Sequence, residues 1–168
     1  TAIAITPANA TCGAANGTLT LGAVSGGTSP YTYSVNASAF TSTLVYSNLA
    51  AGTYTIDVRD ANGCNYSTTA IIINTSGPTA SASAGTIACN GGTTTLTATA
   101  AVGTSPYNYS IDGTTFQAGA TFIVGAGSYT VTIKDANGCI ATASVTITQP
   151  TVLAATETHT AIACNSGT

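Results

Sequence analysis

Charged side chains are scarce in this 168-residue sequence, which has two Lys or Arg residues and five Asp or Glu residues. They make up 4% of the chain, whereas charged residues make up about a quarter of an average soluble domain. Two cations and a net charge of −3 provide no basic surface for nucleic acid or an anionic membrane. One His and five acids leave little for acid–base catalysis, so we expect no enzyme and no cofactor.

Met and Trp are absent, and the helix-forming residues Lys, Glu and Gln are rare. Although 44% of the residues are hydrophobic, no apolar run approaches the ~18 residues that a membrane span requires. The sequence is rich instead in Thr and Ala, with 35 and 30 residues, and Thr favours an extended backbone. This composition predicts an all-β protein without membrane insertion, whose polar surface consists of hydroxyl and amide groups.

The sequence contains a repeat of about 75 residues, a period that indicates an array of similar units. Residues 26–34 return as residues 102–110, and both copies contain Gly-Thr-Ser-Pro-Tyr-x-Tyr-Ser. Residues 51–64 return as residues 126–139, and both copies end in Asp-Ala-Asn-Gly-Cys. Each unit is therefore expected to adopt the same fold.

The repeat divides the chain into two complete units and a fragment of a third. We expect the units to be residues 1–77, 78–150 and 151–168, as in a segment of a longer array. Gly77-Pro78 and Gln149-Pro150 mark the junctions. Because these junctions are short and proline restricts the backbone, we expect the units to form a stiff rod.

Apolar and polar residues alternate within each unit, which is the period of a half-buried strand. The residues that share one face are Tyr54, Ile56 and Val58 in the first unit, and Tyr129, Val131 and Ile133 in the second. Each tyrosine follows an apolar residue by five positions and a Gly by two, at Leu49 and Gly52 for Tyr54. This spacing resembles the tyrosine corner of Greek-key sandwiches. We therefore predict an immunoglobulin-like β-sandwich of about seven short strands per unit, in which both tyrosines are structural.

Asp-Ala-Asn-Gly occurs once in each unit and predicts a tight turn between two strands. The turn residues are Asp60, Asn62 and Gly63 in the first unit, and Asp135, Asn137 and Gly138 in the second. The motif also resembles the start of a calcium loop, but the remaining ligands and the closing Glu are missing. We therefore expect the Asp side chain to accept hydrogen bonds from backbone amides, and we expect no metal site.

The five cysteines are Cys12, Cys64, Cys89, Cys139 and Cys164, and they recur at equivalent places in the repeats. Because none has the spacing of a zinc site, we expect disulfides and an oxidising, extracellular environment. We prefer closure within each unit, by Cys12–Cys64 and Cys89–Cys139, which leaves Cys164 to pair beyond this sequence. Two alternatives stay open: Cys64–Cys89 with Cys139–Cys164, or a bridge from the bottom of one unit to the top of the next.

Taken together, the motifs Cys-Asn-Gly, Gly-Thr-Ser-Pro-Tyr-x-Tyr-Ser, Ala-Gly-Ser/Thr-Tyr-Thr and Asp-Ala-Asn-Gly-Cys resemble the SprB repeat. The resemblance extends from Cys12 to Cys139 and returns at Cys164-Asn165. It implies a very large surface adhesin of gliding Gram-negative bacteria, exported by type IX secretion. In that family a motor carries the filament along the cell surface, where it grips the substratum. The first copy departs from the pattern, because Cys12 is followed by Gly-Ala-Ala-Asn-Gly.

The expected function is structural and adhesive, as a stalk segment of an extracellular, cell-surface filament. The expected partners are further repeats of the same chain, identical chains in the filament, and a surface or glycan ligand. In the alternative, the Thr-rich strand faces bind a glycan or ice directly, through residues such as Thr93–Thr95, Thr130 and Thr132. A flat Thr array in register across repeats favours this alternative, whereas a twisted, irregular outer face favours the stalk.

Overall fold

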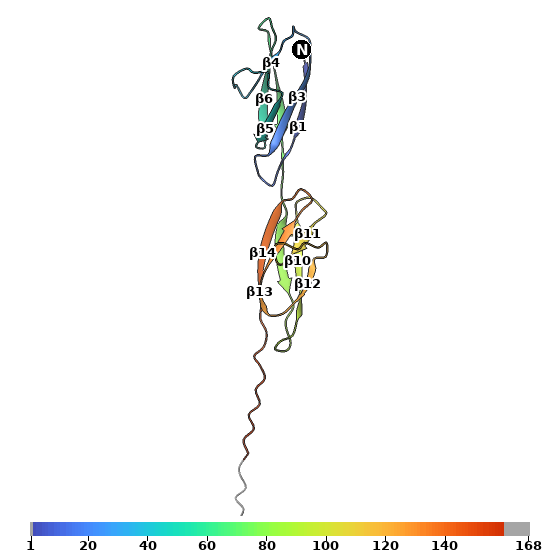
Figure 1. Ribbon diagram of the computed structural model, residues 1–168, viewed down its shortest axis with the longest axis vertical. Coiled ribbons are helices and arrows are strands. Elements are labelled where there is room, and N and C mark those ends of the chain that lie inside the picture. The colour runs from blue at the N-terminus through green and yellow to red at the C-terminus, as the bar shows by residue number, and fades with distance from the viewer. Residues whose placement is uncertain (1, 160–168) are drawn as a thin grey trace, which may run out of the picture.

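A computed structural model describes residues 2–159, which form two β-sandwiches followed by an extended segment (Figure 1). These residues form fourteen strands and no helix, which confirms the predicted all-β fold. Within the described part of the chain, no helix is long and apolar enough to cross a membrane.

The first sandwich contains two three-stranded antiparallel sheets and one short parallel pair. Its strands are, sheet by sheet, β1 (Ala2–Ala8), β3 (Gly17–Ser25) and β5 (Val45–Leu49); β4 (Thr32–Val35), β6 (Gly52–Arg59) and β7 (Asn65–Ile72); and the parallel β2 (Ala10–Thr11) and β8 (Asn74–Thr75). These strand orders correspond to the A-B-E and C-F-G sheets of an immunoglobulin-like sandwich, which confirms the predicted architecture.

The second sandwich repeats both antiparallel sheets. Its strands are, sheet by sheet, β9 (Thr79–Ala84), β10 (Thr94–Ala101) and β12 (Thr121–Val124); and β11 (Asn108–Ser110), β13 (Gly127–Lys134) and β14 (Ile140–Ile147). The short parallel pair has no counterpart among the described residues of this sandwich. Pro150 occupies the place of Thr75, 75 residues later, and proline has no N–H to contribute to such a pairing.

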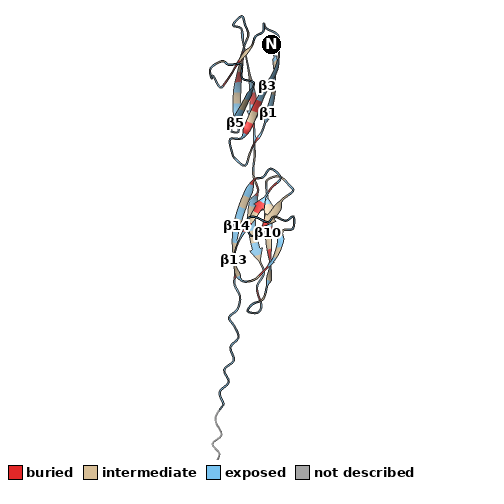
Figure 2. Ribbon diagram, viewed as in Figure 1, coloured by how far each residue is buried: buried red, intermediate tan, exposed pale blue. Residues whose placement is uncertain are grey.

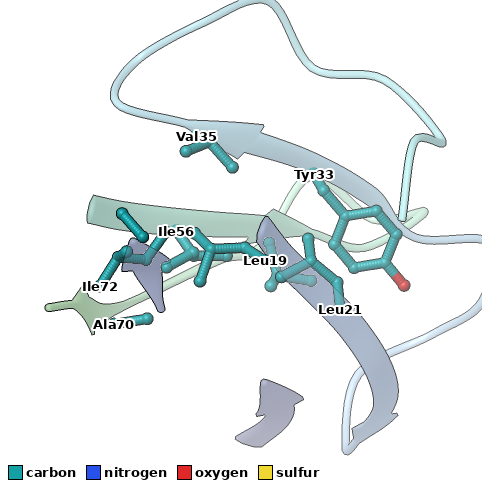
Figure 3. Packing of buried hydrophobic residues seen from close by; sticks show 9 residues of the cluster. Leu19, Leu21, Tyr33, Val35, Ile56, Ala70 and Ile72 are labelled. Carbon is teal, nitrogen blue, oxygen red and sulfur yellow. The ribbon is translucent and has the colours of Figure 1, made fainter. Parts of the chain in front are cut away.

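Each sandwich has its own hydrophobic core between its two sheets, as Figure 2 shows for the buried segments. In the first sandwich, Leu19 and Leu21 from β3 meet Ile56 from β6 (Figure 3). Ile56 and Val58 are 0% and 2% exposed, so the predicted inward face of this strand is confirmed. The core residues of the second sandwich include Leu96, Ala98, Val131, Ile133 and Ile147.

The two sandwiches follow one another along the long axis of the structure, and the chain passes from β8 to β9 between them (Figure 1). The core residues of the first come from positions 10–72 and those of the second from positions 87–147. The predicted unit limits, at 77/78 and 150/151, lie between and after these cores and stay a prediction. The same holds for the stiff rod expected of a longer array.

Candidate functional site at the junction of the two sandwiches

A disulfide joins the two sandwiches. It links Cys12, in the loop after β2, to Cys139, at the turn between β13 and β14, and the two residues are 127 positions apart in the sequence. The preferred pairings, Cys12–Cys64 and Cys89–Cys139, are therefore wrong. The structure contains the bridge from one unit to the next, and Cys64 and Cys89 are exposed free thiols. Cys164, which was expected to pair beyond the sequence, lies outside the described residues.

The length of a strand explains why closure within one sandwich fails. Cys64 directly precedes β7, whereas the N–H of Cys12 donates a hydrogen bond to the carbonyl of Thr75, beyond the other end of β7. The eight residues of β7 span about 26 Å at ~3.3 Å per residue. The two Cα atoms of a disulfide are normally about 4.4–6.8 Å apart, so Cys12 and Cys64 are too distant to form one.

The loop that presents Cys12 is held on the last strand of its own sandwich. Besides the bond from Cys12 to Thr75, of 3.0 Å, the N–H of Gly13 donates to Oδ1 of Asn74 at 2.9 Å. Both Cys12 and Gly13 have positive φ, at 57° and 72°, in the region that favours glycine. The half-cystine therefore has a fixed position at the end of the sandwich that faces the next one.

The turn that presents Cys139 is organised by the carboxylate of Asp135. Its Oδ1 accepts hydrogen bonds from the N–H groups of Asn137 and Cys139, each at 2.9 Å. Its Oδ2 accepts one from the N–H of Thr104 at 3.0 Å. The amide of Asn137 donates to Oγ1 of Thr104 at 2.8 Å, so the turn is tied to the loop between β10 and β11. Gly138 completes the turn at a φ of 81°.

The first sandwich has the same arrangement at its opposite end, around Asp60. Its carboxylate accepts hydrogen bonds from the N–H groups of Thr28, Asn62 and Cys64, at 3.0, 3.0 and 2.8 Å. The bonds from Cys64 and then Thr28 are the main cause of an Asp60 pKa below its ordinary value. Gly63 has a φ of 82°. Among residues 2–159, no three His, Cys, Asp or Glu side chains form a group that could hold a metal ion.

The linker between the sandwiches is packed against the Cys139 turn at two glycines. A Cβ atom at Gly77 would lie 2.9 Å from Cβ of Cys139. A Cβ atom at Gly103 would lie 2.7 Å from the nitrogen of Pro78 and 3.0 Å from Oδ2 of Asp135. A side chain at either position would therefore be too close to its neighbours, so glycine at each position allows the linker and the turn to approach closely.

This junction buries the turn of the second sandwich and leaves the equivalent turn of the first open. Cys139 and Asp135 are 2% and 3% exposed. Their counterparts in the first sandwich differ, since Cys64 is exposed and Asp60 is partly exposed. The two turns have the same hydrogen bonds, so the contact with the neighbouring sandwich accounts for the difference in burial.

The two predicted structural tyrosines each bond to the carbonyl four residues earlier. The hydroxyl of Tyr54 donates to Ala50 at 2.8 Å, and that of Tyr129 donates to Gly125 at 3.2 Å. This is the hydrogen bond expected of a tyrosine corner. Each bond joins two residues of the same sandwich and therefore stabilises that sandwich alone.

Sequence reasoning missed the contacts of the two cations. The guanidinium carbon of Arg59 lies 3.9 Å from the centre of the Phe40 ring. Nζ of Lys134 lies 6.0 Å from the centre of the Phe116 ring. Each pair ties a strand of one sheet to the loop that follows β4 or β11. The repeated spacing could have revealed both pairs, because the cations are 75 residues apart and the rings 76.

Hydroxyl groups pair with one another on the outer face of the second sandwich. Oγ of Ser128 lies 3.2 Å from Oγ1 of Thr146, and Oγ1 of Thr130 lies 3.5 Å from Oγ of Ser144. The first sandwich continues this pattern only in part, because Thr55 stands opposite Thr69 but Ile71 stands opposite Thr53 in the equivalent register. The face of hydroxyl groups is therefore interrupted in the first sandwich.

The fold and the junction define a protein of tandem immunoglobulin-like sandwiches, with a covalent connection between neighbours. Residues 4–40 match the family model of the SprB repeat. This segment is thus similar to an SprB repeat, which supports the family predicted from the motifs.

Several solved structures are similar to the chain. A C-terminal 282-residue fragment of intimin is 13% identical, with a TM-score of 0.41, over 87% of this chain and 64% of that one. The ectodomain of mouse nectin-like molecule 4 is 12% identical, with a TM-score of 0.34, over 91% and 66%. The BSP domain of a biofilm-associated protein is 17% identical, with a TM-score of 0.28, over 89% and 30%. The chain spans less than two thirds of each of these chains. No curated protein matches the sequence.

Proposed function

We propose that this chain is a structural stalk segment of a very large extracellular adhesin, which serves surface adhesion and gliding motility. The observation that carries the proposal is the Cys12–Cys139 bridge between the two sandwiches. The peptide chain and the disulfide form two covalent connections across one junction. Two connections restrict bending and twisting of one sandwich against the next, which a stalk that bears load requires.

The chemistry of the junction supports an extracellular location. A structural disulfide persists in an oxidising environment and is rare where thiols are kept reduced. The match of residues 4–40 to the SprB repeat supports a cell-surface location, and we propose export by type IX secretion. The proposed partners are further repeats of the chain, identical chains in a filament, and a surface or glycan ligand.

The outer surface supports a stalk rather than direct recognition of ice or a glycan. The paired hydroxyls of Ser128 and Thr146 satisfy each other's hydrogen bonds, which leaves fewer of them for a ligand. Ile71, which is 60% exposed, interrupts the corresponding face of the first sandwich. A regular array of Thr across repeats is the feature that the alternative needs.

A deletion series in the cells that display the full protein tests the stalk function. We expect removal of complete repeats to lower attachment and gliding on a solid surface, because the binding region is held closer to the cell. Antibody labelling of intact cells serves as the control for surface display. Unchanged attachment and gliding after most repeats are removed would contradict the proposal. Specific binding of the purified 168-residue chain to a glycan or to ice would favour the alternative.

A further inference from the structure

We infer that Cys64 and Cys89 each form an inter-repeat disulfide like Cys12–Cys139. Their partners are cysteines of two further repeats. Cys64 takes the role of Cys139 toward the preceding repeat, and Cys89 takes the role of Cys12 toward the following one. Every junction of the array then has a disulfide in parallel with its peptide linker. This inference rests on the proposed array of repeats and adds the covalent connection between them.

The loop that contains Cys89 shares one kind of contact with the Cys12 loop. The N–H of Gly91 donates to Oε1 of Gln149 at 2.8 Å, as the N–H of Gly13 does to Asn74. The amide of Asn90 adds a second bond, of 2.9 Å, to the carbonyl of Pro150. These contacts hold the Cys89 loop against the segment that leaves β14, at the far end of the second sandwich (Figure 1).

A groove lies where the following repeat would dock. It has a volume of about 540 Å³, and its lining includes Cys89, Asn90, Pro150, Val152 and Leu153. Val152 and Leu153 are 71% and 95% exposed. They occupy the sequence positions of Gly77 and Pro78, 75 residues later. Because Gly77 and Pro78 are covered by the second sandwich, a third one would cover these apolar side chains in the same way.

The opposite end of the chain presents the complementary surface. A small hollow of about 40 Å³ is lined by residues that include Gly27, Tyr31, Asp60 and Cys64. Gly27 and Asp60 correspond to Gly103 and Asp135, the pair against which Pro78 packs. The first sandwich therefore has the turn, the glycine and the thiol that receive a linker residue at the existing junction.

The linker after β14 differs from the existing linker at several positions, and one of them lies next to the thiol. Val152 stands in place of Gly77, where a Cβ atom would lie 2.9 Å from Cβ of the bonded cysteine. The linker after Pro150 must therefore move away from the thiol by part of an ångström. We expect Val152→Gly to accelerate formation of the second bridge, because it removes this contact.

The bridge forms by thiol–disulfide exchange with a small-molecule disulfide as the oxidant. The thiolate of Cys89 attacks the oxidant and releases one thiol, and a mixed disulfide remains. The thiolate of the cysteine equivalent to Cys64 in the following repeat then attacks the Cys89 sulfur of this mixed disulfide and releases the second thiol. The two cysteines lose two protons and two electrons in total, and the oxidant is reduced to two thiols.

A tandem fusion of two copies tests the inference without any cell or surface. Residue 153 of the first copy is joined to residue 2 of the second, so that β1 follows the linker as β9 does, and Cys164 is replaced by Ser. After oxidation in a glutathione buffer, free thiols are alkylated and the disulfides are mapped by mass spectrometry. We expect a bridge from Cys89 of the first copy to Cys64 of the second, with the Cys12–Cys139 bridges intact.

Free thiols at both of those positions, or closure within one sandwich, would overturn the inference. Neither result would contradict the adhesive function, since adhesion is measured separately by the deletion series. Leu153→Asp in the first copy should slow formation of the bridge at least tenfold, because it places a charge in the docking groove. Ile123→Asp is the matched control, on a residue that is 72% exposed on β12 and outside the groove. Equal rates for the two variants would also overturn the inference.

Discussion

Pro78 lies directly against the backbone of Gly103, so that a Cβ atom at position 103 would be 2.7 Å from the proline nitrogen. Position 103 belongs to the loop between β10 and β11, and Pro78 belongs to the linker, so this contact joins the linker to the second sandwich. Oδ2 of Asp135 is adjacent, at 3.0 Å from the same hypothetical Cβ. The contact therefore connects the linker to the turn that presents the disulfide.

Gly103→Ala should loosen the junction more than Gly113→Ala does. Both residues have a positive φ, of 73° and 75°, so alanine adds a backbone cost of about 1–2 kcal/mol at either one. Only the alanine at 103 meets Pro78, since nothing lies within 4 Å of a Cβ at 113. We expect dithiothreitol to reduce the Cys12–Cys139 bridge several-fold faster in Gly103→Ala than in the parent. In Gly113→Ala we expect the rate of the parent. Equal rates in the two variants would show that the contact does not protect the bridge.

Removal of the disulfide should destabilise the pair of sandwiches strongly. Cys12 and Cys139 enclose a loop of 127 residues, for which the chain-entropy model gives a contribution of about 5 kcal/mol. We expect the variant with Cys12→Ser and Cys139→Ser to lose a stability of this order, summed over both sandwiches in guanidinium unfolding. The matched control replaces the exposed thiols, by Cys64→Ser and Cys89→Ser, and should retain the stability of the parent.

Local periodicity was sufficient to predict the strands and their inward faces. Ile56 and Val58 are two residues apart, and this spacing alone places them on one side of a strand. The bond of the Tyr54 hydroxyl and the bonds of Asn62 and Cys64 to Asp60 are likewise short-range, because each joins groups within four residues in sequence. The bond from Thr28 to Asp60 spans 32 residues and is not a local feature. These parts of the structure depend on neighbouring residues, which the sequence displays directly.

The pairing of the cysteines could not be derived from the same patterns. It depends on whether two residues lie at the same end of a sandwich, and hence on the exact number of strand crossings between them. The first strand of the chain is divided into β1 and β2, and the last strand of the first sandwich into β7 and β8. These divisions change the number of strand crossings. The position of Cys139 against Gly77 also requires the relative placement of two domains, which no local pattern specifies.

The ring of Phe40 should stabilise the first sandwich through Arg59. A guanidinium at 3.9 Å from the ring centre is within the range of a cation–π interaction, which contributes about 0.5–1 kcal/mol at exposed sites. We expect a coupling energy of this size from urea unfolding of Arg59→Gln, Phe40→Leu and the double variant. The cycle separates the ring from the bond between Nε of Arg59 and Oδ1 of Asn65. The corresponding cycle for Lys134 and Phe116, at 6.0 Å, should give a smaller coupling, and a larger one would contradict the assignment.

Stability should fall in acid because of Asp60 and Asp112. The N–H groups of Cys64 and then Thr28 lower the pKa of Asp60, and those of Thr115 and Thr114 lower the pKa of Asp112. Between the lowered folded pKa and the ordinary unfolded value near 3.9, the unfolded chain binds more protons. Each carboxylate therefore contributes stability that is fully present above about pH 4 and is lost as the pH falls through its folded pKa.

The contribution of Asp60 can be isolated with Asp60→Asn. The Asn amide retains one acceptor oxygen but replaces Oδ2, which accepts from Thr28, with an NH₂ group. We therefore expect the variant to be less stable than the parent at pH 7, and we expect the difference to shrink as the pH falls below 4. Chemical unfolding of both proteins between pH 7 and pH 2 provides the measurement, with Asp112→Asn as a second case of the same sign. A difference that stays constant over this range would show that ionisation of Asp60 does not stabilise the turn.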